Sequence, residues 1–150
     1  MTNGWLCYIL KSVDSNRTYV GATDNLYRRL CDHNGLHGKS KGAKATKGQM
    51  WYPFMCITGF PNKIACLSFE SGVRRIKRRK CKHIYGYNKY ASSIDKRVID
   101  VYNLLHVGSP LKKWTNVDLT VNWLEPDSQI DGLILPDKTY QLTNLFEMDI

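Results

Sequence analysis

The stretch that decides the fold is Trp5-Leu6-Cys7-Tyr8-Ile9-Leu10, which is followed closely by Thr18-Tyr19-Val20-Gly21. The first is a continuous apolar run of strand length, and the second is a shorter run of residues that favour strands. Val13-Asp14-Ser15-Asn16 between them is typical of a turn. Because a connection this short cannot form a parallel crossover, the two strands are expected to pair antiparallel as a hairpin.

The rest of the chain alternates between helix and strand patterns. Thr23 or Asp24 can cap a helix that continues to about Asn34 and is closed by Gly35. We further expect a strand over 51–58, a helix from Pro61 through Ile76, a helix over 90–105 and a strand over 119–123. This order predicts an α+β domain with a three-stranded, mainly antiparallel central sheet flanked by helices. We expect the chain to consist of a core over residues 1–85 and a helical and strand extension over residues 86–150. The extension is expected to pack on the core, so that the two form one compact domain.

The charge of the chain is one-sided. The 150 residues carry a net charge of +9, which divides into +13 over residues 1–90 and −4 over residues 91–150. Such a field favours a polyanionic partner, most often nucleic acid. Charge that only keeps the protein soluble is the plainer alternative. An anionic membrane surface is a weaker one, because no segment pairs a basic face with a broad apolar face.

Several protein classes are disfavoured by composition. No apolar run approaches the ~18 residues of a membrane-spanning helix, and the first residues lack the pattern of a secretory signal. The five cysteines are far apart and form no C-x-x-C pair, which argues against a zinc ribbon or a disulfide framework. We therefore expect a reduced intracellular protein that is not secreted.

Two basic segments are candidates for contact with nucleic acid. Residues 35–48 form a loop pattern with four glycines and four lysines, and residues 74–83 form a basic cluster that is expected to place three or four charges on one helix face. A nuclear-targeting signal and a clamp on the phosphate backbone are both open readings of this cluster. The expected phosphate contacts are Arg28, Lys39, Lys41, Lys44, Lys47, Arg74, Arg75, Lys77, Arg78 and Arg79.

A few residues suggest chemistry as well as binding. Tyr8 and Tyr19 lie on the two paired strands, and Gly21 leaves room for a close approach. Arg29 and His33 lie four residues apart on one helix face, where they could meet a phosphate or belong to an ordinary solvated surface. Glu70 is the only acid between His33 and Ile94. It can pair with an arginine one helical turn away, or it can be an oxygen ligand for Mg²⁺.

The ordered set of Leu6-Cys7-Tyr8, Tyr19-Val20-Gly21, Arg29, His33 and Glu70 resembles the GIY-YIG nuclease domain. The first motif is degenerate but keeps its tyrosine. Within that family the chain is most similar to the Slx-type structure-specific endonucleases, over roughly residues 4–127. The stretches that carry this likeness are His33-Asn34-Gly35, Gly42-Ala43-Lys44-Ala45-Thr46, Gly59-Phe60-Pro61, Phe69-Glu70 and Leu119-Thr120-Val121-Asn122-Trp123-Leu124-Glu125-Pro126-Asp127.

The resemblance implies a metal-dependent endonuclease that cuts branched DNA near flaps, forks and four-way junctions, leaving 5′-phosphate and 3′-hydroxyl ends. It implies one Mg²⁺ or Mn²⁺ ion per active site, held by Glu70. Tyr8 would be the general base, Tyr19 would position water or phosphate, and these two could exchange duties. Arg29 would lower the pKa of the tyrosine and stabilise phosphoryl charge, and His33 would relay a proton or hold the phosphate.

The resemblance also bears on location and partners. It implies work in the nucleus or at a site of DNA replication and repair. The Slx-type proteins continue into a cysteine-rich zinc domain that docks a scaffold, and this chain is not expected to have that domain. A second copy or a protein partner could contact the region over residues 91–150.

Three alternatives stay open on the sequence. One is a GIY-YIG nuclease of another kind, such as a homing, repair or small bacterial-type enzyme, against which the late stretch around Trp123 speaks. Another is a DNA-binding module on the same fold that has lost catalysis. The third is a basic interaction module that binds DNA without a metal and tolerates loss of Glu70.

Overall fold

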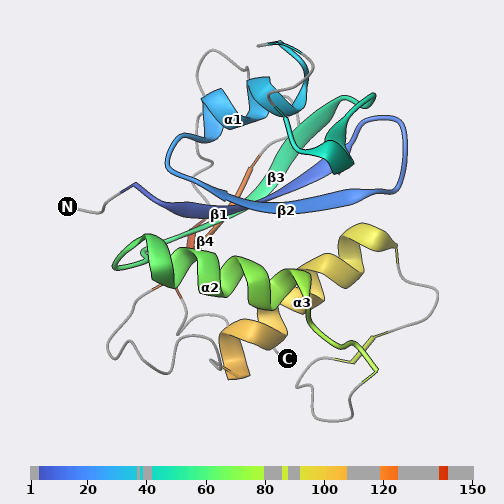
Figure 1. Cartoon of the computed structure of the whole chain (residues 1–150). Coiled ribbons are helices and arrows are strands. Elements are labelled where there is room, and N and C mark those ends of the chain that lie inside the picture. The colour runs from blue at the N-terminus through green and yellow to red at the C-terminus, as the bar shows by residue number, and fades with distance from the viewer. Residues whose placement is uncertain are drawn as a thin grey trace.

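The computed structural model describes residues 4–36, 38, 42–79, 86–87, 92–107, 119–124 and 139–141. They form a five-stranded sheet in the order β2-β1-β3-β4-β5, in which every neighbouring pair is antiparallel (Figure 1). The strands are β1 (Leu6–Ser12), β2 (Thr18–Thr23), β3 (Trp51–Thr58), β4 (Thr120–Trp123) and β5 (Thr139–Gln141). The expected α+β class and the expected hairpin of β1 with β2 are confirmed.

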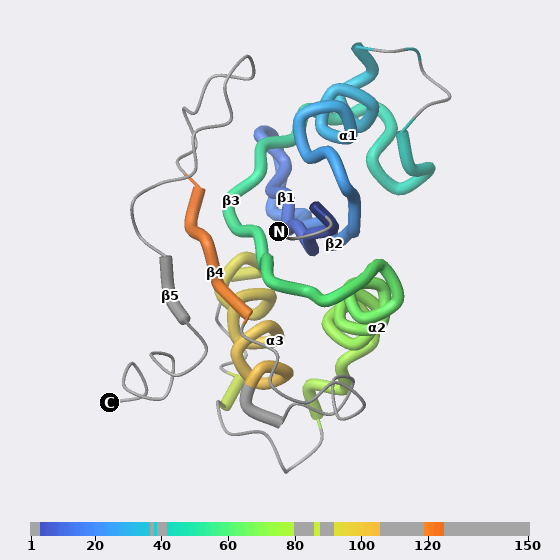
Figure 2. The backbone as a smooth tube through the Cα atoms, turned by 90° about the vertical axis from the view of Figure 1, so that its left-hand side faces the viewer, coloured from blue at the N-terminus to red at the C-terminus, as the bar shows by residue number. Residues whose placement is uncertain are grey.

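Helices cover the two faces of this sheet. Helix α1 (Leu26–His33) lies on one face, and α2 (Lys63–Arg74) and α3 (Ser93–Val107) lie on the other (Figures 1 and 2). Strand β1 is therefore central and buried on both faces, which explains its continuous apolar sequence. Cys7 and Ile9 belong to the larger core on the α2 and α3 face, whereas Tyr8 and Leu10 belong to a smaller core against α1.

Helix α1 begins one or two residues later than the sequence predicts, which offered Asp24 or Thr23 as its cap. Asn25 is the N-cap, and its side chain accepts a hydrogen bond from the backbone N–H of Arg28 at 3.0 Å. Thr23 is instead buried at the end of β2, where its hydroxyl accepts a hydrogen bond from the N–H of Asn25. The C-terminal end is as expected, since Gly35 follows the helix with φ +77°.

Helix α2 is shorter than its pattern predicts. It is capped by Asn62, ends at Arg74 and has Arg75 as its C-cap. The basic cluster therefore does not continue the helix, and the expectation of three or four charges on one helix face is wrong. The physical reason lies outside the local sequence: Arg78 turns toward α3 and forms an ion pair with Asp100 at 2.6 Å.

The C-terminal part of the chain supplies two further strands to the sheet. β4 pairs with β3 where the late strand was expected, and β5 pairs with β4. The sheet is thus larger than the three-stranded centre that the sequence indicates. Helix α3 packs on α2, and the division into 1–85 and 86–150 stays a prediction.

No helix among the described residues has the length and apolar character needed to cross a membrane. Cys7, Cys31, Cys56 and Cys66 are buried free thiols.

Candidate active site

The two motif tyrosines and His33 form an aromatic cluster between α1 and the sheet. The ring of Tyr19 lies 4.9 Å from that of His33, and the ring of Tyr8 lies 5.8 Å from it, measured between centroids. Tyr8 and Tyr19 are 6.4 Å apart. Tyr8 is 1% exposed and His33 is 4% exposed. The fold thus brings together three residues that lie as many as 25 positions apart in the sequence.

Gly21 makes the burial of Tyr8 sterically feasible. It is the cross-strand partner of Tyr8 in the β1–β2 pairing, and residues paired in this way project from the same face. A Cβ atom on Gly21 would overlap the hydroxyl oxygen and Cζ of Tyr8 and would lie 3.0 Å from its Cε1. The room that the sequence assigned to phosphate or backbone is thus occupied by the phenol of Tyr8.

A buried hydrogen-bond chain runs through the cluster. The hydroxyl of Tyr8 is 2.7 Å from Nε2 of His33, and Nδ1 of His33 is 2.8 Å from Oγ1 of Thr46. Burial lowers the pKa of His33 to about 4, and the positive charge of Arg29 acts in the same direction. His33 is therefore neutral at pH 7 in this state.

The acidity of Tyr8 is set by opposing influences. Burial raises its pKa above the ordinary value, and Tyr19 adds to the increase. Arg29 opposes both through its charge and a side-chain hydrogen bond, but burial dominates. Tyr8 is thus a neutral phenol at pH 7, and Arg29 by itself does not make it a phenolate.

Arg29 fits both interpretations that the sequence left open. Its guanidinium lies 3.6 Å from the carboxylate of Asp32 on the same helix, with 30% of the side chain exposed. The same charge acts on both Tyr8 and His33. A cation at the rim of a buried phenol and imidazole can meet the oxygens of an incoming phosphate.

Thr46 is a site residue that the sequence analysis missed. It ends a 3-10 turn, η1 (Lys44–Thr46), within the basic glycine-rich segment, and it is completely buried. The indole Nε1 of Trp51 donates to the backbone oxygen of Thr46 at 2.9 Å. A threonine in a basic loop gives no periodic signal, so only the quoted family stretch that contains it could have drawn attention to it.

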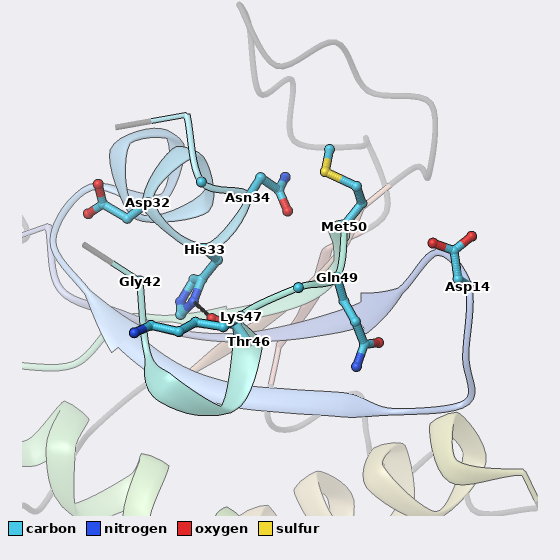
Figure 3. A pocket seen from close by; sticks show the side chains of 11 residues that line it. Asp14, Asp32, His33, Asn34, Gly42, Thr46, Lys47, Gln49 and Met50 are labelled. Atoms are coloured by element: carbon cyan, nitrogen blue, oxygen red, sulfur yellow. Dashed lines mark hydrogen bonds between the residues drawn. The ribbon is translucent and has the colours of Figure 1, made fainter. Parts of the chain in front are cut away.

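The segment that carries Thr46 is fitted against the end of α1. A Cβ atom on Gly42 would lie 2.7 Å from the backbone oxygen of Asp32 and 3.1 Å from Cα of His33. A cavity of about 530 Å³ opens beside this contact; it is lined by residues 32–35, 42 and 46–50 and by Asp14. Figure 3 shows the hydrogen bond that joins His33 and Thr46, two of the residues that line this cavity.

Glu70 lies apart from the aromatic cluster. It is on α2, which covers the opposite face of the sheet from α1 (Figure 1). The residue is 8% exposed and its Oε2 is 3.6 Å from Arg74. Burial raises the pKa of Glu70, and Arg74 and Arg75 partly oppose the increase. The helical ion pair considered for Glu70 is therefore present.

Glu70 by itself offers a divalent ion a single carboxylate. Within the part of the chain that the structure describes, no group of three or more His, Cys, Asp or Glu side chains forms a metal-binding cluster. An ion at Glu70 would then take one protein carboxylate and complete its shell with water and phosphate oxygens. This is a common arrangement for Mg²⁺.

The expected phosphate contacts have different surroundings. Lys39 and Lys41 lie outside the described residues. Arg28 is an exposed side chain paired with Asp24 at 3.3 Å. Six other residues expected to contact phosphate are also exposed: Lys44, Lys47, Arg74, Arg75, Lys77 and Arg79.

For Arg78 the structure indicates a different role from the others. Its Nε and a terminal nitrogen donate to both carboxylate oxygens of Asp100, at 2.6 to 3.2 Å. Asp100 is fully buried and also accepts from Tyr87 at 2.7 Å and Arg97 at 3.1 Å. Arg78 therefore fastens the segment after α2 to α3.

A model of the GIY-YIG catalytic domain matches residues 4–104. An uncharacterized protein of Acanthamoeba polyphaga mimivirus is 51% identical over 78 residues, 52% of this chain and 47% of that protein. The structure-specific endonuclease subunit slx1 of Xenopus laevis is 35% identical over 114 residues, 74% of this chain and 38% of that subunit. Its namesake in Pyrenophora tritici-repentis is 31% identical over 145 residues, 82% of this chain and 38% of the subunit. The chain spans less than half the length of each of these relatives.

Proposed function

The chain belongs to the GIY-YIG catalytic domain family, and from this we propose that it is a structure-specific DNA endonuclease. Its substrates are branched DNAs, such as flaps, forks and four-way junctions, and its products carry 5′-phosphate and 3′-hydroxyl ends. The observation that carries the proposal is the hydrogen bond of 2.7 Å between Tyr8 and His33, with Arg29 and the ring of Tyr19 close by. Such a role belongs where DNA is replicated and repaired.

Hydrolysis requires that water lose a proton as it attacks phosphorus. Tyr8 takes that proton on its phenolic oxygen while its own proton passes to Nε2 of His33. The P–O3′ bond then breaks and the 3′-oxygen leaves with a proton from solvent. Before substrate binds, burial opposes charge on both partners. The negative charge of a bound phosphodiester favours the protonated imidazole and so assists the transfer.

Arg29 and Tyr19 act on the phosphate rather than on the proton. The planar guanidinium of Arg29 presents paired N–H donors that match phosphate oxygens. It stabilises the extra charge that develops as water adds, because it is fixed near the site before the reaction begins. Tyr19 packs on His33 at 4.9 Å and on Trp51 at 6.4 Å, and in this proposal its hydroxyl orients water or phosphate.

Glu70 would hold the divalent ion, Mg²⁺ or Mn²⁺. An ion held there would supply Lewis-acid chemistry to a phosphate oxygen. Glu70 supplies a hard oxygen donor from a rigid helix, in the middle of a stretch rich in cations. The ion pair of Glu70 with Arg74, at 3.6 Å, is longer than a hydrogen bond and keeps the carboxylate oriented.

DNA is held by its backbone in this proposal. Lys44 and Lys47 lie near the α1 side of the sheet, and Arg74 and Arg75 end α2 on the other face. Cations on both sides of one sheet can hold two duplex arms that meet at a branch. Recognition is then by shape and phosphate spacing, with affinity that falls steeply with salt.

The proposal is tested by incubating the protein with labelled flap, fork, four-way-junction and linear duplex DNA, with Mg²⁺ or with EDTA. We expect metal-dependent cutting near the branch and little cutting of the linear duplex. Glu70→Gln should abolish cutting, whereas Asp95→Asn, which removes a carboxylate from the exposed start of α3, should not. Absence of metal-dependent cutting on every substrate would refute the proposal.

Arg29→Ala supplies a second arm of the test. It should lower kcat far more than affinity for DNA, because one arginine among many phosphate contacts matters little to binding but much to the transition state. Lys96→Ala on α3 is the matched loss of one positive charge. Equal loss of affinity and kcat in Arg29→Ala would assign this residue to binding alone.

A further inference from the structure

The hydroxyl of Thr46 is placed to control the protonation of His33. Thr46 Oγ1 lies 2.8 Å from Nδ1 of His33 and 2.8 Å from the backbone oxygen of Ala43. Both threonine and histidine are buried, at 0% and 4% exposure, so solvent does not compete for these bonds.

The direction of the hydrogen bonds follows from the number of protons. A threonine hydroxyl has one proton, and a carbonyl oxygen can only accept. The short contact with Ala43 therefore requires that Thr46 donate to it. If the proton went to His33 instead, two oxygens would face each other at 2.8 Å without a proton between them.

Thr46 must then accept from His33. A neutral imidazole carries its proton on one nitrogen only, and His33 is neutral because burial lowers its pKa to about 4. The proton is thus on Nδ1, and Nε2 has a lone pair directed at Tyr8, 2.7 Å away. The phenol of Tyr8 is the donor in that contact.

We propose that Thr46 is a positioning residue that fixes the Nδ1–H tautomer of His33, so that Nε2 can accept the phenolic proton of Tyr8. The catalytic use of this arrangement rests on the proposed function, but the tautomer does not. Thr46 acts through His33 and touches neither water nor phosphate in this role. With the other tautomer, Nε2–H would point at the oxygen of Tyr8, and His33 could not receive a proton from it.

The position of Thr46 is itself held by other elements. Trp51 Nε1 donates to the backbone oxygen of Thr46, and Arg17 donates to the backbone oxygen of Ala45 at 2.8 Å. The end of the β1–β2 turn, through Arg17, and the start of strand β3, through Trp51, therefore fix the turn that carries the hydroxyl. The basic segment thus contributes a group to the interior of the site as well as lysines to its surface.

The tautomer can be measured directly by ¹⁵N NMR on the full chain with labelled histidine. In wild type we expect a pyrrole-type shift for Nδ1 and a pyridine-type shift for Nε2 of His33, with the signal assigned by its loss in His33→Asn. Thr46→Ser should keep this pattern, and Thr46→Val, which has the same shape without the hydroxyl, should shift it toward the other tautomer. A wild-type His33 protonated on Nε2 would overturn the inference without any variant.

Kinetics give a second measurement. Thr46→Val should lower kcat by roughly 10- to 100-fold, by analogy with the loss of a partner that orients a metal-bound histidine, with KM for DNA nearly unchanged. Thr46→Ser should recover most of the rate. A Thr46→Val protein with wild-type tautomer, rate and pH profile would contradict the inference. If wild type shows the expected tautomer but cuts no DNA, the proposed function fails and the positioning role stands.

Discussion

Gly21 faces Tyr8 directly across the β1–β2 pairing, and the phenol of Tyr8 fills the space that a side chain on Gly21 would need. Gly21, the last residue of the second motif, thus leaves the space that Tyr8, the last residue of the first motif, needs. Two tripeptides that look like separate sequence signals are one packing unit, and their joint presence is what brings the hydroxyl of Tyr8 to His33.

The first prediction concerns this contact. Gly21→Ala should displace the ring of Tyr8, lower the free energy of unfolding by about 1–3 kcal/mol as overpacked sites do, and sharply reduce cleavage. Gly86→Ala is the matched control, because a Cβ there would meet nothing within 4 Å. Urea denaturation and cleavage rates measure both effects. Two variants of equal stability and rate would show that the space around Tyr8 is not limiting.

The second prediction is the pH dependence of stability due to His33. Its pKa falls from 6.5 to about 4 on folding, so the unfolded chain binds more protons between these values. This part of the stability is complete above pH 6.5 and is lost as the pH falls toward 4, by up to about 3 kcal/mol. His33→Gln should remove this loss. Urea denaturation of wild type and His33→Gln from pH 4.5 to 7.5 tests this prediction. If the free energies of unfolding of the two proteins changed in parallel with pH, the prediction would be refuted.

The third prediction separates Arg78 from its neighbour Arg79. Asp100 is buried and holds Arg78, Arg97 and Tyr87, so Asp100→Ala should cost about 3–5 kcal/mol of stability by leaving buried charges unpaired. Arg78→Ala should also destabilise the fold, whereas Arg79→Ala, at an exposed position, should leave the unfolding midpoint unchanged and weaken DNA binding. The reverse pattern would make Arg78 a DNA contact after all.

The fourth prediction concerns the basic surface. Lys44→Ala and Lys47→Ala should each weaken binding to a four-way junction and reduce the slope of log affinity against log salt by about 1, as expected for one lost phosphate contact. Lys96→Ala should change neither. Fluorescence anisotropy between low and moderate salt measures the slopes. Unchanged slopes in both variants would place the DNA elsewhere on the protein.

Some of the site was readable from local patterns. The runs around Tyr8 and Tyr19 predicted the hairpin, and the register seen in the structure then places both tyrosines on the same face. Arg29 and His33 are one helical turn apart, and their shared face followed from that spacing. Helix ends were less readable, because Asn25 competes with Thr23 and Asp24 as a cap, and the end of α2 depends on where Arg78 finds a partner.

The sequence by itself determined the hairpin, the third strand, the first helix and the solitary position of Glu70 among cations, because these depend on neighbours within a few residues. Only the tertiary structure decided that Thr46 meets His33, that His33 is neutral and donates from Nδ1, and that Arg78 belongs to Asp100. These features depend on hydrogen bonds between residues 13 to 25 positions apart and on exclusion of water. Desolvation and long-range contact arise from packing, which no local pattern encodes.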